Sequence, residues 1–208
     1  MDQRVDPNSK TVQLTPSPWA NPTPAGLVGL AVACFCFFAL LSGNVTKEAM
    51  PLLGLWLLGG FIIQFTVAIL DYKSNNSTGG NTFLFFAAFF MFVGGVEMLM
   101  KYDMIVRQVP FDARIDGWAW AVLTLVLWLW TPAFLKNSAL LFAIVVLLDV
   151  ALPFVTLMDL GLIEKSNAFI PAWALLGAGA VGIYLSGAIV VNTAFGREVM
   201  PLPGPLVD

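Results

Sequence analysis

Residues 24–41 read PAGLVGLAVACFCFFALL, eighteen consecutive residues without a charged side chain. An α-helix needs about 20 apolar residues to cross the hydrocarbon core of a bilayer, and this run approaches that length. The run is continuously apolar, whereas the strands of a membrane barrel alternate between apolar and polar residues. Pro24 stands where the first turn of a helix tolerates proline. The stretch therefore predicts a membrane-spanning helix at about residues 24–42.

Five further predominantly apolar stretches follow in the 208-residue chain. The six expected spans lie at about residues 24–42, 51–70, 81–99, 117–135, 138–158 and 171–195. We therefore predict an all-α membrane protein with one six-helix transmembrane domain over residues 21–203. A polar tail of residues 1–20 precedes this domain, and a short tail of residues 204–208 follows it. Because the number of spans is even, both termini are expected on the same side of the membrane.

The composition excludes several classes of protein. The chain is 59% apolar and 11% charged, whereas soluble domains are about 45–50% apolar and about 25% charged. Its net charge of −3 does not suit a nucleic-acid partner. It contains no histidine, and its two cysteines, Cys34 and Cys36, point to different faces of a helix. We therefore expect that the protein binds no metal and no cofactor. We also expect that it is not an enzyme, since no nucleophile–base pair is present.

The basic residues do not orient the chain. Five lie on the side of the termini and five on the other side, so the positive-inside rule selects neither orientation. No Lys or Arg is expected within a span. An anion would therefore depend on helix dipoles and amides, or would cross together with a proton. In the long connection around residues 98–116, Lys101 lies four residues after Glu97, so these two are expected to pair on one helix face.

The odd-numbered spans begin alike, each with an asparagine. Asn21, Asn81 and Asn137 are separated by 60 and 56 residues, which indicates three repeated helical hairpins. Asparagine side chains cap helix amides, and helix N-termini facing one way present partial positive charge to an anion. We interpret the three asparagines, with Pro22 and Thr82, as a substrate vestibule. Alternatively, they are independent caps that share no site.

Asp149 is the acidic residue deepest within an expected span. Acidic side chains are costly in a membrane and by default mark function. Pro153 lacks the N–H group that would bond to the Asp149 carbonyl, so the helix is expected to kink there. Two roles are open: a proton-coupling site, or a protonated acid hydrogen-bonded to a neighbouring helix. Gln64 and Thr124 are further polar candidates for a pore lining, and interhelical hydrogen bonds explain them equally well.

Three groups of residues resemble signature segments of one family. Residues 21–27, NPTPAGL, resemble the opening N-P-[AG]-P-L-G-L of the acetate uptake transporter family, the succinate–acetate permeases. Gly59 and Gly60 with Gln64, residues 71–73 (DYK) and residues 80–83 (GNTF) resemble its second segment. Residues 183–185 (IYL), Asn192, residues 195–197 (FGR) and residues 200–201 (MP) resemble its C-terminal segment. The resemblance covers about residues 19–203.

The resemblance implies a particular fold and function. Each subunit would arrange its six helices as three hairpins around a pore of its own, as in urea and amide channels. The subunits would assemble as a homohexamer in the cell membrane, plasma or inner, with both termini in the cytoplasm. The family's vestibule asparagines match Asn21 and Asn81, and Asn137 matches by position alone. Family members move acetate, and some move succinate, passively or with protons.

The resemblance also implies an apolar constriction about nine or ten residues into each odd-numbered helix. Counting from the three asparagines gives Leu30, Met91 and Leu147. A hydrophobic ring of this kind excludes hydrated ions. This sequence departs from the family pattern at Asp71, which replaces a glutamate, and at residues 74–80, which form an insertion.

Three functions remain open from the sequence. The first is transport of acetate and short monocarboxylates, with succinate as a further candidate substrate. The protein would act as an anion channel or a proton symporter. Its partners would be the short carboxylate, the lipid bilayer and further copies of the chain. The second is a channel for a neutral solute, urea or a short amide. The third is a membrane sensor or scaffold that transports nothing, for which the charged connection of residues 101–116 is the support.

Overall fold

The computed structural model describes residues 19–207, and the described residues form helices and no strand. Six helical segments are long and apolar enough to cross a membrane: Thr23–Leu41, Lys47–Lys73, Ser77–Val106, Arg114–Lys136, Ala139–Asp159 and Lys165–Phe195. The predicted all-α fold with six spans is confirmed.

Several segments join an α-helix to a short stretch of another helix type. The elements are α1 (Thr23–Leu41), η1 (Lys47–Ala49), α2 (Met50–Lys73), α3 (Ser77–Phe85), η2 (Phe86–Val93), α4 (Gly94–Val106), α5 (Arg114–Trp130), η3 (Thr131–Lys136), α6 (Ala139–Asp159), η4 (Lys165–Ala168) and α7 (Phe169–Phe195). The third segment therefore runs through α3, η2 and α4. Its middle part, η2, is a π-helix, in which each turn holds more residues than an α-helical turn.

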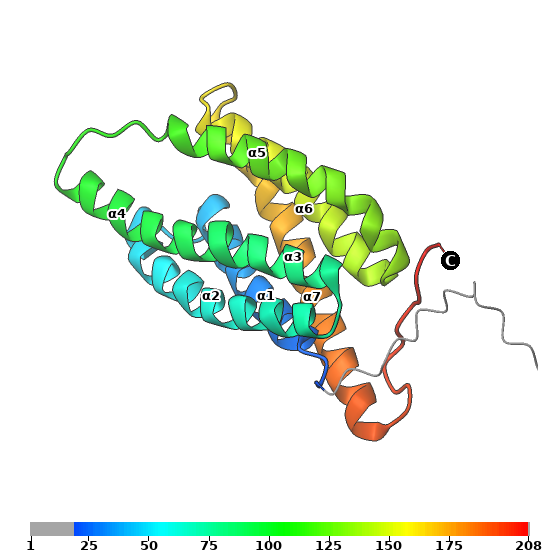
Figure 1. Cartoon of the computed structure of the whole chain (residues 1–208). Coiled ribbons are helices and arrows are strands. Elements are labelled where there is room, and N and C mark those ends of the chain that lie inside the picture. Colours follow the sequence, from blue (N-terminus) through cyan, green and yellow to red (C-terminus); the bar gives the residue numbers. More distant parts are fainter. Residues whose placement is uncertain (1–18, 208) are drawn as a thin grey trace, which may run out of the picture.

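The six segments form three antiparallel hairpins, which are α1 with α2, α3–α4 with α5, and α6 with α7 (Figure 1). α1 packs on α2 and α7, α6 packs on α5 and α7, and α2 packs along the whole third segment. The starts of α1, α3 and α6 lie at one end of the bundle, near the last described residues (Figure 1). We call this the terminal end and the opposite end the loop end.

Side chains close the bundle where the third segment meets α5. The ring of Phe90 lies edge-on to Trp120, with centroids 6.1 Å apart. Nearer the loop end, the Lys101 ammonium lies 2.5 Å from the Asp116 carboxylate. These contacts join η2 and α4 of the third segment to α5.

The third segment begins earlier than the span expected at residues 81–99. Asn76 caps α3, because its Oδ1 accepts a hydrogen bond from the Gly79 N–H group at 3.0 Å. Asn81, expected at the helix start, therefore lies inside the helix. Of the residues interpreted as an insertion, 74–76 connect α2 to α3 and 77–80 form the first turn of α3.

The same segment also ends later than expected, at Val106. Its charged residues remain helical because they pair along the helix. Lys101 Nζ lies 3.7 Å from Glu97 Oε2, which confirms the predicted i,i+4 pair, and Arg107 pairs with Asp103. Lys101 thus lies in the third helical segment, two residues beyond the expected end of the span at residue 99.

α2 and α4 approach each other closely at glycine. A Cβ atom added to Gly54 would lie 2.7 Å from the Gly95 carbonyl oxygen, and one added to Gly95 would lie 3.0 Å from the Gly54 carbonyl oxygen. Small residues permit such close backbone contact between membrane helices, which gains packing energy that apolar burial alone does not supply in lipid. The contact fixes the third segment against α2.

The C-terminal segment folds back over the terminal end. Asn192 Oδ1 accepts hydrogen bonds from the N–H groups of Val199 and Met200, and the Tyr184 hydroxyl donates to the Pro201 carbonyl at 2.9 Å. The Gly204 carbonyl then accepts the first N–H group of α6, from Ala139, at 3.1 Å. The family-like C-terminal residues thus hold this segment beside the start of α6.

Candidate functional site

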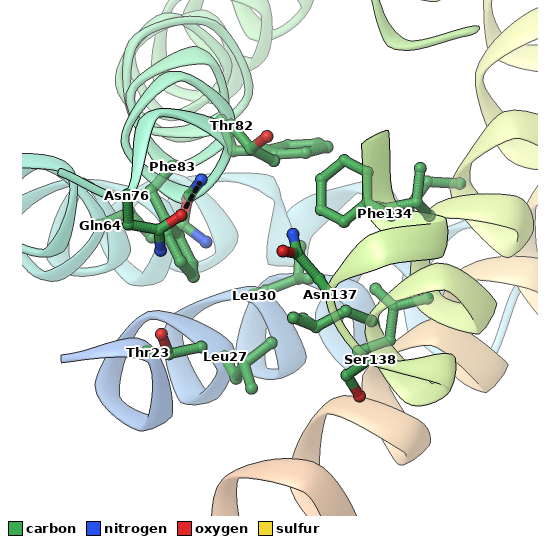
Figure 2. A pocket seen from close by; sticks show the side chains of 16 residues that line it. Thr23, Leu27, Leu30, Gln64, Asn76, Thr82, Phe83, Phe134, Asn137 and Ser138 are labelled. Atoms are coloured by element: carbon green, nitrogen blue, oxygen red, sulfur yellow. Dashed lines mark hydrogen bonds between the residues drawn. The ribbon is translucent and has the colours of Figure 1, made fainter. Parts of the chain in front are cut away.

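A cavity of about 220 Å³ lies at the terminal end, where three helices begin. We call it the terminal cavity. Its walls come from the N-terminal halves of α1 and α6 and from the start of the third segment, with Phe134 of η3 and one side chain from α2 (Figure 2). The lining residues are Thr23, Leu27, Leu30, Gln64, Asn76, Gly79, Thr82, Phe83, Phe86, Phe134, Asn137, Ser138, Leu141, Ile144, Val145 and Leu148.

The helix starts around the terminal cavity are held by side-chain caps. The Thr23 N–H donates to Asn21 Oδ1 at 3.0 Å, Asn76 caps α3, and Ser138 Oγ accepts the Leu140 N–H at 3.2 Å. The first N–H groups of a helix lack intrahelical partners and carry partial positive charge. Within the described residues, no charged side chain lines this cavity. An anion in this cavity would therefore be stabilised by backbone dipoles and amide groups.

Two buried oxygen atoms of the lining residues have no hydrogen-bond partner among the described residues. Gln64 is fully buried; its Nε2 donates to the Gly26 carbonyl at 3.2 Å, and its Oε1 is unpaired. Thr82 Oγ1 is the second unpaired atom. A buried polar atom without a partner is costly, so a bound solute or water with hydrogen-bonding groups gains from meeting these two.

A second cavity, of about 170 Å³, lies toward the loop end. We call it the loop cavity. α1, the third segment and α6 contribute to both cavities. α6, for example, contributes Leu141, Ile144 and Leu148 to the terminal cavity, and Ala151 and Val155 to the loop cavity. Residues spaced by three and four share a face of a helix. The cavities therefore lie in line along the bundle.

The loop cavity differs from the terminal cavity in charge. Glu97, Lys101 and Asp159 contribute to its lining. The Lys101 ammonium is held between Glu97 and Asp116, so it bridges α4 and α5. The loop cavity thus combines an apolar interior with a charged rim.

Aromatic rings separate the two cavities. Phe86 lines the terminal cavity and Phe90 lines the loop cavity, and their ring centroids are 5.9 Å apart. Phe90 also stacks on Phe37 of α1, with centroids 5.1 Å apart. Leu30 and Leu148 complete the inner end of the terminal cavity from α1 and α6. A solute that passes between the cavities must cross this apolar barrier.

Two of the three residues predicted for the constriction lie elsewhere. Leu30 lines the terminal cavity, but Met91 faces α2, where its Sδ lies 2.9 Å from a Cβ atom added to Gly60. Leu147 faces α7, where its Cδ1 lies 3.3 Å from a Cβ atom added to Gly177. For Met91 the count is displaced because the third segment begins four residues earlier than assumed and contains a π-helix, which changes the direction of its side chains. In α6 the neighbouring residue, Leu148, faces the cavity.

The predicted vestibule residues are divided between places. Asn137 and Thr82 line the terminal cavity. Asn21 and Pro22 form the start of α1 without lining it. Asn81 points elsewhere: it accepts a hydrogen bond from the Tyr72 hydroxyl at 3.0 Å and donates to the Ser77 carbonyl at 2.8 Å.

Asp149 and Thr124 lie between α5 and α6, outside both cavities. The Thr131 hydroxyl donates to Asp149 Oδ2 at 2.6 Å, and the Trp128 indole N–H donates at 3.2 Å to the Asp149 carbonyl that Pro153 leaves free. Thr124 shares a buried hydrogen bond with Thr156 at 3.0 Å. For both Asp149 and Thr124, interhelical hydrogen bonding was one of the two roles considered from the sequence, and these contacts are of that kind. The proton-coupling role of Asp149 stays a prediction.

Two important cavity residues were missed from the sequence. Asn76 supplies the amide on the α3 wall, where Asn81 was expected, and residues 76–79 (NSTG) do carry a helix-start signal, an asparagine before small residues. Phe134 closes the cavity from η3. Its place depends on the turn between α5 and α6, for which the sequence offers no local signal.

Comparison with known proteins identifies relatives of this chain. The model of the GPR1/FUN34/yaaH family matches residues 4–203. The succinate-acetate/proton symporter SatP of Escherichia coli strain K12 is 26% identical over 185 residues, which cover 88% of this chain and 95% of that protein. The protein of the same description from Shigella flexneri matches to the same extent. A solved structure of the bacterial acetate channel SatP superposes with a TM-score of 0.72 at 21% identity, covering 88% of this chain and 99% of that one.

Proposed function

We propose that this chain, which belongs to the GPR1/FUN34/yaaH family, carries acetate and related short-chain monocarboxylates across a membrane. The observation that carries the proposal is the convergence of three helix N-termini on the uncharged terminal cavity, in line with the loop cavity. The description of the relatives as succinate-acetate/proton symporters supports this substrate class. Succinate is included as a possible second substrate.

The proposed pathway has three parts. A carboxylate collects in the terminal cavity, where the amides of Asn76 and Asn137 and the helix N-termini offer hydrogen bonds and partial positive charge. It then sheds water to pass the apolar barrier near Leu30 and Phe90, which excludes hydrated sodium and chloride. In the loop cavity it meets the charged rim that contains Lys101. Transport takes place as an anion channel or as a proton symport.

The predicted residues outside the cavities act through neighbours. Asn21 and Pro22 fix the first turn of α1, and Asn81 holds Tyr72 at the end of α2. Their loss would reshape the rim of the terminal cavity without removing a direct contact to the substrate. Asp149, which the sequence suggests for proton coupling, bonds to Thr131 outside both cavities, and Asp149→Asn tests that role directly.

The protein is an integral membrane protein with six membrane-spanning helices. We place it in the cell membrane, plasma or inner, with both termini in the cytoplasm, as a homohexamer in which each subunit has its own pore. Large apolar side chains such as Leu52, Trp56, Trp118 and Leu129 are exposed on the outside of the bundle. They suit contact with lipid or with neighbouring subunits.

Uptake of labelled acetate into proteoliposomes tests the proposal. The experiment compares uptake with and without an inward proton gradient, at matched membrane potential. Accumulation driven by the gradient identifies a symporter, and rapid equilibration without accumulation identifies a channel. Uptake equal to that of protein-free liposomes in both conditions would contradict the proposal.

A neutral amide is the second candidate substrate, and one observation favours it. The unpaired Gln64 Oε1 atom accepts hydrogen bonds, and an amide N–H group would donate to it, whereas a carboxylate would not. Counterflow of labelled acetamide or urea decides between the candidates. Saturable amide flux that acetate does not inhibit would replace the carboxylate as substrate.

A further inference from the structure

Asp71 is an acidic side chain buried near the end of α2. It is 2% exposed, and its Oδ2 atom has no hydrogen-bond partner among the described residues. A buried carboxylate keeps its charge at a high cost unless a positive group lies nearby, and otherwise it binds a proton. The Asn76 amide beside the carboxylate offers it a hydrogen bond but no positive charge. Asp71 therefore needs a positive neighbour, a proton, or each in turn.

The carboxylate of Asp71 lies at the N-terminus of α3, in the wall of the terminal cavity. A Cβ atom added to Gly79 would collide with Asp71 Oδ2 and with the Asn76 amide nitrogen. Both Gly79 and Asn76 line the cavity, and the Asn76 N–H donates to the Asp71 carbonyl at 2.9 Å. The carboxylate thus lies beside Gly79 and Asn76, and Figure 2 shows the Asn76 side chain at the cavity.

Gln64, which lies on the same face of α2 as Asp71, also indicates a ligand in this cavity. Gln64, seven residues before Asp71, lines the cavity and leaves its buried Oε1 atom unpaired. Residues seven apart share a helix face. One face of α2 therefore presents an unpaired amide oxygen at the cavity and an unpaired carboxylate oxygen at its wall.

Among the described contacts, the N-terminus of α3 is the positive group nearest to the Asp71 side chain. Neither α1 nor α3, which pack on this part of α2, contains an Asp, Glu, Lys or Arg residue. On α2 itself, the Tyr72 hydroxyl bonds to Asn81, and Lys73 lies over the Trp19 ring at 5.0 Å. The acidic and basic residues of α4, which also packs on α2, lie toward the loop end. Ionised Asp71 and a substrate carboxylate would therefore draw on the same α3 N-terminus.

We infer that Asp71 couples proton binding to carboxylate binding in the terminal cavity, an inference that rests on the proposed transport of carboxylates. In its ionised form, Asp71 occupies the positive end of α3 and repels a second anion. When its carboxylate takes a proton from solvent, that repulsion ends and the helix N-terminus is available to the substrate. Proton and carboxylate then promote each other's binding to the same extent, because thermodynamic linkage is reciprocal.

The test compares Asp71→Asn with the wild type in proteoliposomes. Acetate counterflow is measured at about pH 5.5 and about pH 7.5, with equal pH on both sides, and flux through protein-free liposomes is subtracted. Asparagine imitates the protonated acid at every pH. We expect the wild type to carry severalfold more acetate at the lower pH, and Asp71→Asn to carry at the higher pH about what the wild type carries at the lower.

Asp103→Asn is the matched control, because Asp103 is an exposed acid near the loop end that pairs with Arg107. It should keep the wild-type pH profile, and so should Asp71→Glu, which preserves a titrating group. An Asp71→Asn variant whose acetate flux changes with pH as steeply as the wild type would overturn the inference. A wild type without acetate flux would instead overturn the proposed function, so the two failures are distinguishable.

A measurement on the wild type covers the case in which Asp71→Asn does not fold. Sodium acetate is added to purified protein in weakly buffered detergent solution, with a matched addition to detergent alone. Proton uptake in excess of the blank, saturating with acetate, supports the coupling. Acetate binding without any excess proton uptake between about pH 6 and about pH 7.5 would contradict it.

Discussion

The two ends of the pathway meet a carboxylate with different chemistry. The terminal cavity is lined by amides, hydroxyls and helix N-termini, and its described lining has no charged side chain. The loop cavity has an apolar interior with Glu97, Lys101 and Asp159 at its rim. Backbone dipoles are fixed by the fold and are not free to titrate, whereas side-chain charges pair, separate and bind protons. The terminal cavity therefore depends on the geometry of helix starts, and the loop cavity on the balance of charges.

The largest effect is expected from Lys101→Ala at the loop cavity. This change leaves Glu97 and Asp116 side by side without their cation, and breaking a buried ion pair costs several kcal/mol. Because Lys101 is partly exposed, we expect a loss of about 2 kcal/mol, seen as a lower Tm in detergent. Arg107→Ala, which removes an exposed pair with Asp103, should cost about 0.5 kcal/mol or less. Equal losses for the two variants would show that the rim charges do not depend on Lys101.

A change of similar size is expected from Gly79→Ala at the terminal cavity. Its new methyl group would collide with Asp71 and Asn76, so we expect a loss of about 1–3 kcal/mol and weaker acetate uptake. Gly59→Ala is the control, because an added Cβ atom at Gly59 has no neighbour within 4 Å. It should stabilise the protein by about 0.5–1 kcal/mol through helix propensity. Thermal unfolding of both variants decides, and a harmless Gly79→Ala would contradict the close approach at the start of α3.

Asn76→Ala should have a moderate effect. It removes the α3 cap, at a cost of about 1 kcal/mol, and one amide from the cavity wall. We expect a severalfold higher acetate concentration for half-maximal counterflow. Asn81→Ala tests the sequence-based choice of vestibule residue, and it should change this concentration less, because Asn81 bonds to Tyr72 and Ser77 instead of lining the cavity. A larger effect of Asn81→Ala would return Asn81 to the vestibule.

The smallest effect on flux is expected from Asp149→Asn. Asp149 lies between α5 and α6 and bonds to Thr131, so its amide version keeps a hydrogen bond and leaves both cavities intact. We expect acetate counterflow and its pH dependence to stay within a factor of about two of the wild type. Loss of gradient-driven accumulation in this variant would establish the proton-coupling role that the sequence suggested for Asp149.

Long apolar runs made the six spans predictable. Pro24 at the start of the first span, and the spacing of Glu97 and Lys101, also led to correct expectations, because these signals are local. The vestibule was predictable as a kind of site, three helix starts facing one way. Of the residues predicted for the vestibule, Asn137 and Thr82 line the terminal cavity, whereas Asn81 does not. Gln64, predicted as a pore-lining candidate, and Leu30, predicted for the constriction, line it as well.

The misplaced residues of the third segment come from counting along the sequence, which does not show where α3 begins or that η2 is a π-helix. Reading residues 74–80 as an insertion displaced the start of α3, and the π-helix η2 then changed which side chains face the pathway. Met91 was therefore chosen in place of Phe86 and Phe90. Asp71 was recorded as a departure from the family pattern, and its place beside Asn76 depends on how α2 packs on α3.

Blocking the passage between the two cavities tests most directly whether acetate moves from one to the other. Leu30 lies at the inner end of the terminal cavity, and Leu30→Trp would fill the passage. Labelled-acetate counterflow is measured for wild type and Leu30→Trp at equal protein content, with Tm and a monodisperse elution profile as checks of folding. The account predicts saturable flux for the wild type and flux close to protein-free liposomes for folded Leu30→Trp. Full acetate flux through folded Leu30→Trp would contradict it.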